Sequence, residues 1–199
     1  MLYNFFHVFR PPLHRVYIAV LHLPLTTFTL YPHTITMFRK TLSKEQALQK
    51  LKQYCGYQER SHQEVQQKLY DLGVWKQDHD ELIAALIEQD YLNEERFVTA
   101  FARGKFRMKQ WGRIRIRYEL KQRRISEYLL KKALAEIPEE EYLRTMQKLL
   151  EDKYDSLRSE QYMVRQKKTM DFMTARGYEN NLVSPALRAY IATLKEERG

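Results

Sequence analysis

Signals for the start of an α-helix recur along this chain from Ser43 onward. Ser43 and Ser61 each open a capping box, in which a glutamine or glutamate three residues later helps to satisfy free backbone N–H groups. Apolar residues at spacings of three and four follow each start, as on the buried face of a helix. Further starts are indicated at Asp78, Asn93, Ser126 and Pro138. From residue 43 the chain is therefore predicted to be all-α.

The composition agrees with a helical protein and limits its chemistry. The 199 residues include only 6 glycines and 6 prolines, too few for the many tight turns of an all-β domain. The single cysteine, Cys55, excludes a disulfide framework or a thiolate metal cluster and suits a reducing compartment. We expect a cytoplasmic protein without a cofactor.

The N-terminal segment differs from the rest of the chain. Residues 1–44 contain no Asp or Glu, and the first 36 residues hold four of the six prolines and four of the six histidines. A signal peptide lacks its cleavage site here, and Pro24 interrupts the apolar run that a membrane-spanning helix needs. We expect residues 1–36 to be a non-globular or non-native leader ahead of a start at Met37. A helix or hairpin packed on the domain is the alternative.

Two sets of apolar positions repeat with a period of about 50 residues. The first set is Val65, Leu69 and Val74, then Ile116, Leu120 and Ile125, then Thr169, Met173 and Tyr178. The second set is Leu82, Ile83, Leu86 and Ile87, then Leu129, Leu130, Ala133 and Leu134, then Leu182, Val183, Ala186 and Leu187. These sets predict an elongated array of three tandem three-helix repeats, at residues 43–92, 93–137 and 138–199. The helix after Asn93 is expected to carry Phe97, Phe101 and Met108.

The charge is concentrated in residues 103–124, which contain ten Lys or Arg and one acid, against a net charge of +9 for the chain. On a helix from residue 112 to 124, Ile116 and Leu120 define the buried line, and Ile114 and Tyr118 point almost opposite. An apolar patch among cations is typical of a surface that binds phosphates or acidic side chains. The alternative is that Ile114 and Tyr118 pack on a neighbouring repeat while the cations are solvated.

Three segments carry a resemblance to a known family. The segments 60–65, 91–98 (Tyr-Leu-Asn-Glu-Glu-Arg-Phe-Val) and 115–120 (Arg-Ile-Arg-Tyr-Glu-Leu) resemble the regulatory protein RecX, over about residues 43–190. RecX proteins usually have Gly where Gln110 and Arg124 stand, and a non-glycine residue in a left-handed turn carries strain.

The resemblance implies a non-enzymatic modulator of the RecA recombinase, with roles in DNA repair, homologous recombination and the SOS response. RecX-like proteins lie in the groove of the RecA filament on single-stranded DNA, bridge its subunits, and inhibit ATP hydrolysis, strand exchange and co-protease activity. A monomer is expected, without a membrane partner, and single- or double-stranded DNA is a further partner considered. The basic stretch is expected to supply the contact surface, and the third repeat a secondary patch that includes Arg176. The predicted contact residues are Arg103, Lys105, Arg107, Lys109, Arg113, Arg115, Arg117, Tyr118, Lys121, Arg123, Lys167 and Lys168.

Other function classes make different predictions. A helix-turn-helix DNA-binding protein would place base-reading side chains at the start of one recognition helix, whereas Arg and Lys are spread along the helix here. A protein-binding helical adaptor would keep its affinity at high salt. An enzyme is not indicated, because the sequence has no phosphate-binding glycine loop, no His-Glu-x-x-His pair and no glycine-flanked serine. Trp111 could extend the basic surface or fill the core.

Overall fold

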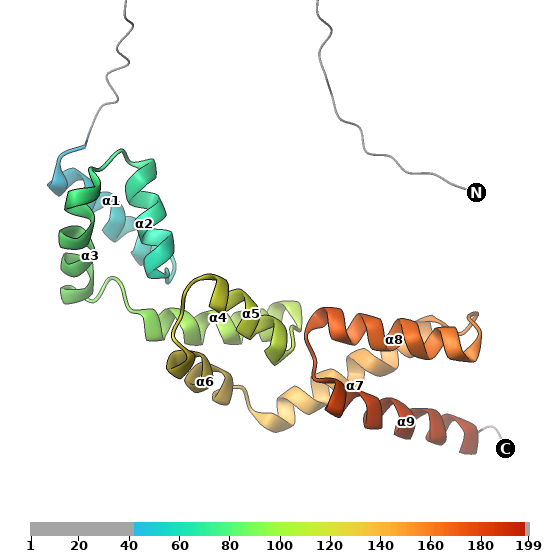
Figure 1. The fold of residues 1–199 in the computed structure, drawn as a ribbon. Helices are drawn as coiled ribbons and strands as arrows, with labels where there is room; N and C mark the ends of the chain where they lie inside the picture. Colours follow the sequence, from blue (N-terminus) through green and yellow to red (C-terminus); the bar gives the residue numbers. More distant parts are fainter. Residues whose placement is uncertain (1–41, 198–199) are drawn as a thin grey trace, which may run out of the picture. The chain divides into compact units, whose positions relative to one another are not determined.

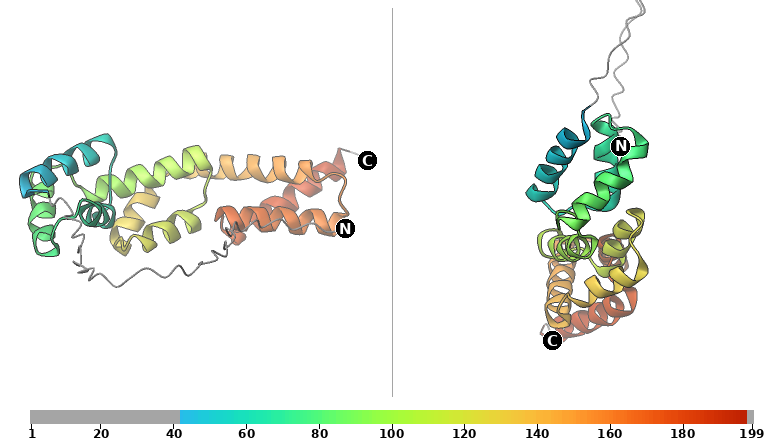
Figure 2. Two further views of the ribbon diagram at one scale, coloured as in Figure 1. Left: turned by 90° about the horizontal axis from the view of Figure 1, so that it is seen from above. Right: turned by 90° about the vertical axis from the view of Figure 1, so that its left-hand side faces the viewer.

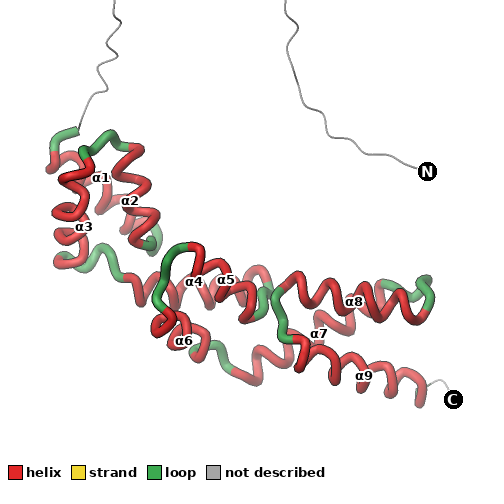
Figure 3. The backbone as a smooth tube through the Cα atoms, in the orientation of Figure 1, coloured by secondary structure: helices red, strands yellow, loops and turns green. Residues whose placement is uncertain are grey.

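The structure, a computed structural model, describes residues 42–197, and every regular element among them is helical (Figure 3). The expected leader at residues 1–36 lies outside the described residues. The described helices all belong to one compact unit, residues 38–199. None of them is long and apolar enough to cross a lipid bilayer.

A helix begins directly after each of the predicted starts, which are Ser43, Ser61, Asp78, Asn93, Ser126 and Pro138. Ser43 and Ser61 form complete capping boxes, with Ser43 Oγ accepting from the Gln46 N–H at 3.3 Å and Ser61 Oγ from the Glu64 N–H at 3.2 Å. Asn93 and Ser126 cap their helices in the same way. The elements, labelled in Figure 1, are α1 (Lys44–Tyr57), α2 (His62–Asp71), the short 3₁₀ helix η1 (Lys76–Asp78), α3 (His79–Glu88), α4 (Glu94–Lys109), α5 (Arg113–Gln122), α6 (Glu127–Ala135), α7 (Glu139–Ser156), α8 (Tyr162–Arg176) and α9 (Asn180–Glu196).

The helices pack in consecutive groups of three. Helix α3 packs on α1 and α2, α4 packs on α5 and α6, and α7 packs on α8 and α9. The third group is seen from two further directions in Figure 2, where α8 and α9 both lie along α7. The all-helical content and this packing confirm the predicted fold class of tandem three-helix repeats.

Two hydrophobic cores lie inside these groups. One is confined to α1–α3 and the connection to α4, and the other runs through α4–α9. The first repeated set of positions has the expected register, because every member of it is buried in each of the three copies. Its first members, Val65, Ile116 and Thr169, are each completely buried. The helices of the second and third groups therefore share one core.

In the first copy of the second repeated set, the predicted alignment was wrong by one residue. Leu82 and Leu86 are buried like Leu130 and Leu134, whereas Ile87 is 47% exposed. Leu82 corresponds to Leu130, an offset of 48 residues, whereas the predicted alignment paired it with Leu129 at an offset of 47. The connection from α2 to α3, which contains η1, is three residues longer than that from α5 to α6.

Met108, which the helix α4 carries as expected, lies outside the core, since it is 83% exposed. Phe97, Ala102 and Phe106 define the buried line of α4, and Phe101 packs beside it. Met108 follows Phe106 by two residues, which is about 200° around the helix. Its side chain therefore belongs to the solvent face.

The turns after α4 and α5 keep the left-handed geometry for which RecX proteins usually use glycine. Gln110 has φ 52° and Arg124 has φ 58°. The Gln110 N–H donates to the Phe106 carbonyl at 2.8 Å, as in a normal helix C-cap. Both non-glycine residues therefore adopt a conformation that costs backbone strain.

Candidate partner-binding surface

The first turn of α5 is bonded to the third helical group. The Gly112 N–H donates to the Arg176 carbonyl at 2.8 Å, and the Ile114 N–H donates to the Gly177 carbonyl at 3.0 Å. Between them, the Arg113 N–H donates to the hydroxyl of Tyr142 at 3.2 Å. These bonds satisfy N–H groups that a helix start leaves free. They hold α5 against the end of α8 and the start of α7.

Six of the predicted contact residues in the basic stretch lie within 4.0 Å of a carboxylate. Surface ion pairs of this kind contribute at most about 1 kcal/mol to stability. An anionic group of a partner therefore competes with only a weak internal carboxylate contact at each cation. Their charges are nevertheless partly neutralised. The pairs are Arg103–Glu136 at 2.6 Å, Arg107–Glu141 at 3.8 Å, Arg113–Glu139 at 2.6 Å, Arg117–Glu127 at 2.9 Å, Lys121–Glu127 at 3.3 Å and Arg123–Glu119 at 3.4 Å.

Of the other three cations of the predicted set in this stretch, Lys105 and Arg115 lie over the Trp111 ring, and Lys109 lies two residues before it in the chain. Lys105 Nζ lies 5.2 Å from the centre of a Trp111 ring, and the Arg115 guanidinium lies 4.2 Å from it. Lys109 ends α4 beside them, and Arg176 reaches the same place from α8. We call Lys105, Lys109, Arg115 and Arg176 the Trp111 cluster. Among residues 42–197, none of its four members has a carboxylate within 4.0 Å.

Helix C-termini orient the two arginines of the Trp111 cluster. Arg115 Nη1 donates to the Ala175 carbonyl at 3.2 Å, near the end of α8. Arg176 Nη1 donates to the Lys109 carbonyl at 2.9 Å, at the end of α4. These carbonyls carry the negative end of the helix dipole, which favours cations. Each guanidinium has five N–H donors and therefore keeps others for an external phosphate or carboxylate.

Trp111 both fills part of the core and extends the basic surface, the two alternatives considered from the sequence. Its side chain is half-buried and packs against the core that runs through α4–α9. Its ring also lies beneath Lys105 and Arg115, where cation–π attraction restrains the two charged groups. Trp111 thus fills the edge of the core and supports the cationic surface.

The outer face of α5 is apolar as well as basic. Ile114 is 53% exposed and Tyr118 is 61% exposed, whereas Ile116 and Leu120 are completely buried. This is the arrangement that the helical projection predicts. In the described part of the chain, neither Ile114 nor Tyr118 is covered by a neighbouring repeat.

A groove of about 630 Å³ lies beside Ile114, between α5, α6 and the start of α7. Its lining includes Leu134, Ile137 and Pro138, together with Lys131 of α6. Lys131 could not be identified from the sequence, because only the packing of α6 on α5 brings it to the same groove as Arg117.

Carboxylates at this groove are engaged by neighbouring side chains. The hydrogen bond from Arg113 holds the pKa of Glu139 below its usual value, although burial acts slightly against it. The hydroxyl of Tyr142 donates to Glu179 at 2.5 Å. Burial, followed by this bond to Glu179, raises the pKa of Tyr142 well above its ordinary value. Tyr142 therefore stays protonated and keeps Glu179 in place.

The two predicted lysines of the third repeat lie apart from the Trp111 cluster. Lys167 pairs with Asp171 at 2.7 Å, and Lys168 pairs with Glu160 at 2.5 Å. Both precede Arg176 on α8 by eight or nine residues, which corresponds to roughly 12 to 14 Å along the helix axis. The structure does not bring them together with the basic residues of α4 and α5.

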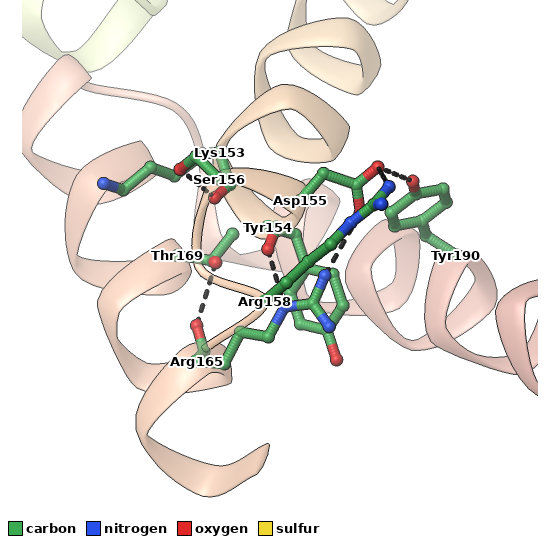
Figure 4. A network of polar contacts seen from close by, with 8 residues as sticks. All are labelled: Lys153, Tyr154, Asp155, Ser156, Arg158, Arg165, Thr169 and Tyr190. Atoms are coloured by element: carbon green, nitrogen blue, oxygen red, sulfur yellow. Dashed lines mark hydrogen bonds and ion pairs between the residues drawn. The ribbon is translucent and has the colours of Figure 1, made fainter. Parts of the chain in front are cut away.

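A polar network fixes the helix that carries Arg176 (Figure 4). Arg165 of α8 is only 9% exposed, and its Nε donates to the Tyr154 carbonyl at 2.6 Å. Its Nη2 donates at 3.1 Å to Asp155, which also accepts from the Tyr190 hydroxyl at 3.1 Å. Because these residues belong to α7, α8 and α9, the network ties all three helices of the third group together.

Sequence comparison matches part of the chain to a known family domain. A family model described as "RecX, second three-helix domain" matches residues 93–134, which include α4, α5 and all but the last residue of α6. The chain is 26% identical over 145 residues to the regulatory protein RecX of Bacillus cytotoxicus, covering 73% of this chain and 52% of that protein. It is 29% identical over 132 residues to RecX of Clostridium perfringens, covering 65% of this chain and 61% of that protein.

The fold of the chain is also similar to that of solved RecX structures. The crystal structure of RecX from Lactobacillus salivarius has a TM-score of 0.66 and 19% identity, covering 73% of this chain and 95% of that one. Another crystal structure of regulatory protein RecX also has a TM-score of 0.66, with 72% of each chain covered. The chain spans about half the length of the Bacillus relatives that it matches. These matches confirm the predicted resemblance.

Proposed function

From the confirmed resemblance to the RecX family, we propose that the chain is a regulatory protein that binds the RecA recombinase filament on single-stranded DNA. Bound as a monomer in the filament groove, it inhibits ATP hydrolysis, strand exchange and co-protease activity. It acts in the cytoplasm by binding alone, without catalysis or a cofactor.

The observation that carries this proposal is the Trp111 cluster. Lys105 and Arg115 share the Trp111 ring, Arg176 bonds to the backbone of Lys109, and none of these four cations has a carboxylate within 4.0 Å in residues 42–197. Their mutual repulsion is relieved when an anionic surface approaches. A nucleoprotein filament offers such a surface in its phosphates and acidic side chains.

The second and third helical groups supply a stiff support for this contact. They share one core, and backbone hydrogen bonds join α5 to the end of α8. A stiff body that touches neighbouring subunits restrains their relative movement. We propose that this restraint is how binding slows ATP turnover.

A helix-turn-helix DNA reader fits this geometry less well. The N-terminal residues of a recognition helix contact base edges in the major groove. At the start of α5, Gly112 is buried against Gly177, and three successive N–H groups are bonded to the third group. The end of α5 that would enter the groove is therefore covered.

The test is ATP turnover by the cognate RecA on single-stranded DNA, measured as purified chain is added. We expect turnover to fall as the chain reaches stoichiometric amounts. The triple variant Lys105→Gln, Lys109→Gln and Arg115→Gln should require at least tenfold more protein for the same inhibition, because it removes three unneutralised charges.

The matched control is the triple variant Lys50→Gln, Lys76→Gln and Lys148→Gln. These three lysines are exposed and lie outside the cluster, so the control loses the same net charge. It should inhibit like the wild type. Unchanged turnover with an excess of the wild-type chain would contradict the proposed function. Equal losses in the two triple variants would contradict the assignment to the Trp111 cluster.

A further inference from the structure

The groove beside Ile114 has an aliphatic lining, of which Ile114 and Pro138 are exposed and Leu134 and Ile137 are buried. Ile114 is 53% exposed at its rim, and Leu134, Ile137 and Pro138 continue the apolar lining from α6 to the start of α7. Each square ångström of apolar surface left in water costs on the order of 25 cal/mol. Covering the exposed side chain of Ile114 with an apolar group of a partner is therefore favourable in free energy.

The charges around the groove favour a single acidic group on that partner. Glu139 is held by Arg113, and Glu179 accepts the hydroxyl of Tyr142. Lys131 is exposed and, among residues 42–197, has no carboxylate within 4.0 Å. A carboxylate placed in the groove beside Lys131 would pair with a lining cation that no carboxylate of residues 42–197 balances.

The lining suits a protein segment better than a nucleic acid. Sequence-independent binding of single strands relies on aromatic rings that stack on bases, and none of the described residues that line this groove is aromatic. The two rim carboxylates, Glu139 and Glu179, would also repel a continuous phosphate backbone. A peptide can avoid them, because it can offer one carboxylate at one place.

The groove is held in shape by contacts already described. Ile114 is fixed through its N–H bond to Gly177, and the Tyr142 hydroxyl joins the Arg113 N–H to Glu179. The volume of about 630 Å³ can hold several side chains. Binding therefore needs little rearrangement of the groove, which lowers its entropic cost.

We infer that this groove is a second docking site, which takes a protein segment that places an apolar side chain on Ile114 and a carboxylate beside Lys131. The inference rests on the proposed function, because the segment belongs to the protein part of the RecA filament. The Trp111 cluster supplies salt-sensitive attraction, and the groove adds an apolar contact that salt does not screen.

The experiment compares two probes: the RecA filament on single-stranded DNA, held by a non-hydrolysable ATP analogue, and the same DNA without RecA. Binding of the labelled chain is measured at several salt concentrations. Ile114→Ser should weaken filament binding about tenfold with an unchanged salt dependence, because it removes an apolar anchor. Lys131→Gln should weaken it about threefold and reduce the salt dependence. Neither variant should alter binding to bare DNA.

Ile87→Ser is the matched control, since Ile87 is an isoleucine 47% exposed on α3 and lies outside the groove. It should bind like the wild type. Circular dichroism checks the fold of each variant, and Lys131→Gln keeps the test valid if Ile114→Ser unfolds, because Lys131 is a surface residue.

Three outcomes would overturn the inference, and they are distinguishable. If Ile114→Ser or Lys131→Gln binds the filament as tightly as Ile87→Ser does, the groove is not a docking site, and the proposed function is unaffected. Equal loss on bare DNA would assign the groove to nucleic acid. No binding of the wild type to the filament would reject the proposed function itself, and with it the partner named here.

Discussion

Gly112 and Gly177 are in direct backbone contact, with no room for a side chain between them. A Cβ atom added to Gly112 would overlap the carbonyl group of Gly177, and one added to Gly177 would overlap Arg115. Gly177 also has φ +85°, a conformation that L side chains rarely adopt. This contact lets the end of α8 meet the start of α5, and it is why Arg176 and Arg115 lie on one surface.

We predict that Gly112→Ala destabilises the protein by about 3 kcal/mol or more, because backbone atoms cannot move aside as a flexible side chain can. Gly104→Ala is the matched control, since nothing lies within 4 Å of a Cβ added there. Gly104 lies inside α4, so Gly104→Ala should stabilise the protein by up to about 1 kcal/mol. Urea unfolding followed by circular dichroism measures both changes. Similar stability of the two variants would contradict the close contact.

Two neighbouring buried tyrosines should respond in opposite ways to loss of their hydroxyl groups. The rings of Tyr142 and Tyr178 lie 5.3 Å apart, and both side chains are completely buried. Tyr142→Phe should cost about 1.5 to 3 kcal/mol, because it removes a hydrogen bond to the charged Glu179. Tyr178→Phe should be neutral or stabilising, since the Tyr178 hydroxyl has no hydrogen-bond partner in the described residues. Unfolding free energies of the two variants test this difference.

The same tyrosines predict a loss of stability at alkaline pH. Burial raises the pKa of Tyr178 to about 12, and it raises the pKa of Tyr142 as well. The unfolded chain releases these protons near pH 10, while the folded chain keeps them. The two tyrosines therefore contribute fully to the free energy of unfolding below pH 10, and this contribution falls as the pH rises toward 12. Unfolding at pH 8 and pH 11 should show a smaller decrease for Tyr178→Phe than for the wild type, and equal decreases would argue against this contribution.

Local signals were sufficient to predict the helices and most of the core. Capping residues such as Ser43 and Ser61 act on N–H groups three residues away, so their effect can be predicted without tertiary structure. The helical projection of α5 likewise predicted that Ile114 and Tyr118 are exposed. Each of these inferences depends on geometry within one helix.

The remaining features depend on contacts between helices. The division of the predicted cations into paired and unpaired sets could not be foreseen, because Glu136, Glu139 and Glu127 reach them from other helices. The convergence of Arg176 with Arg115 depends on a backbone contact between residues 65 positions apart, Gly112 and Gly177. The division into repeats at residues 43–92, 93–137 and 138–199 stays a prediction.

Strain at the turn after α4 leads to a further prediction. Gln110 has φ 52°, which costs a non-glycine residue about 1 kcal/mol or more. Gln110→Gly should therefore leave stability unchanged or raise it by up to about 1 kcal/mol, the gain being limited by the greater freedom of glycine in the unfolded chain. Gln53→Gly, at an exposed position inside α1, should instead lower stability by about 1 kcal/mol. If both substitutions destabilise equally, the turn is not strained.

The last prediction separates the two kinds of cation in the basic stretch. Lys105→Gln with Lys109→Gln removes two charges that no described carboxylate balances. Arg117→Gln with Lys121→Gln removes two charges that share Glu127. The first double variant should weaken filament binding about tenfold and reduce the slope of log K against log salt by about 1.5. The second should change affinity less than threefold, because the ion pairs with Glu127 already direct both side chains toward that carboxylate rather than toward a partner. Equal losses would mean that the whole stretch contacts the partner, as the sequence alone predicts, and that its ion pairs open on binding.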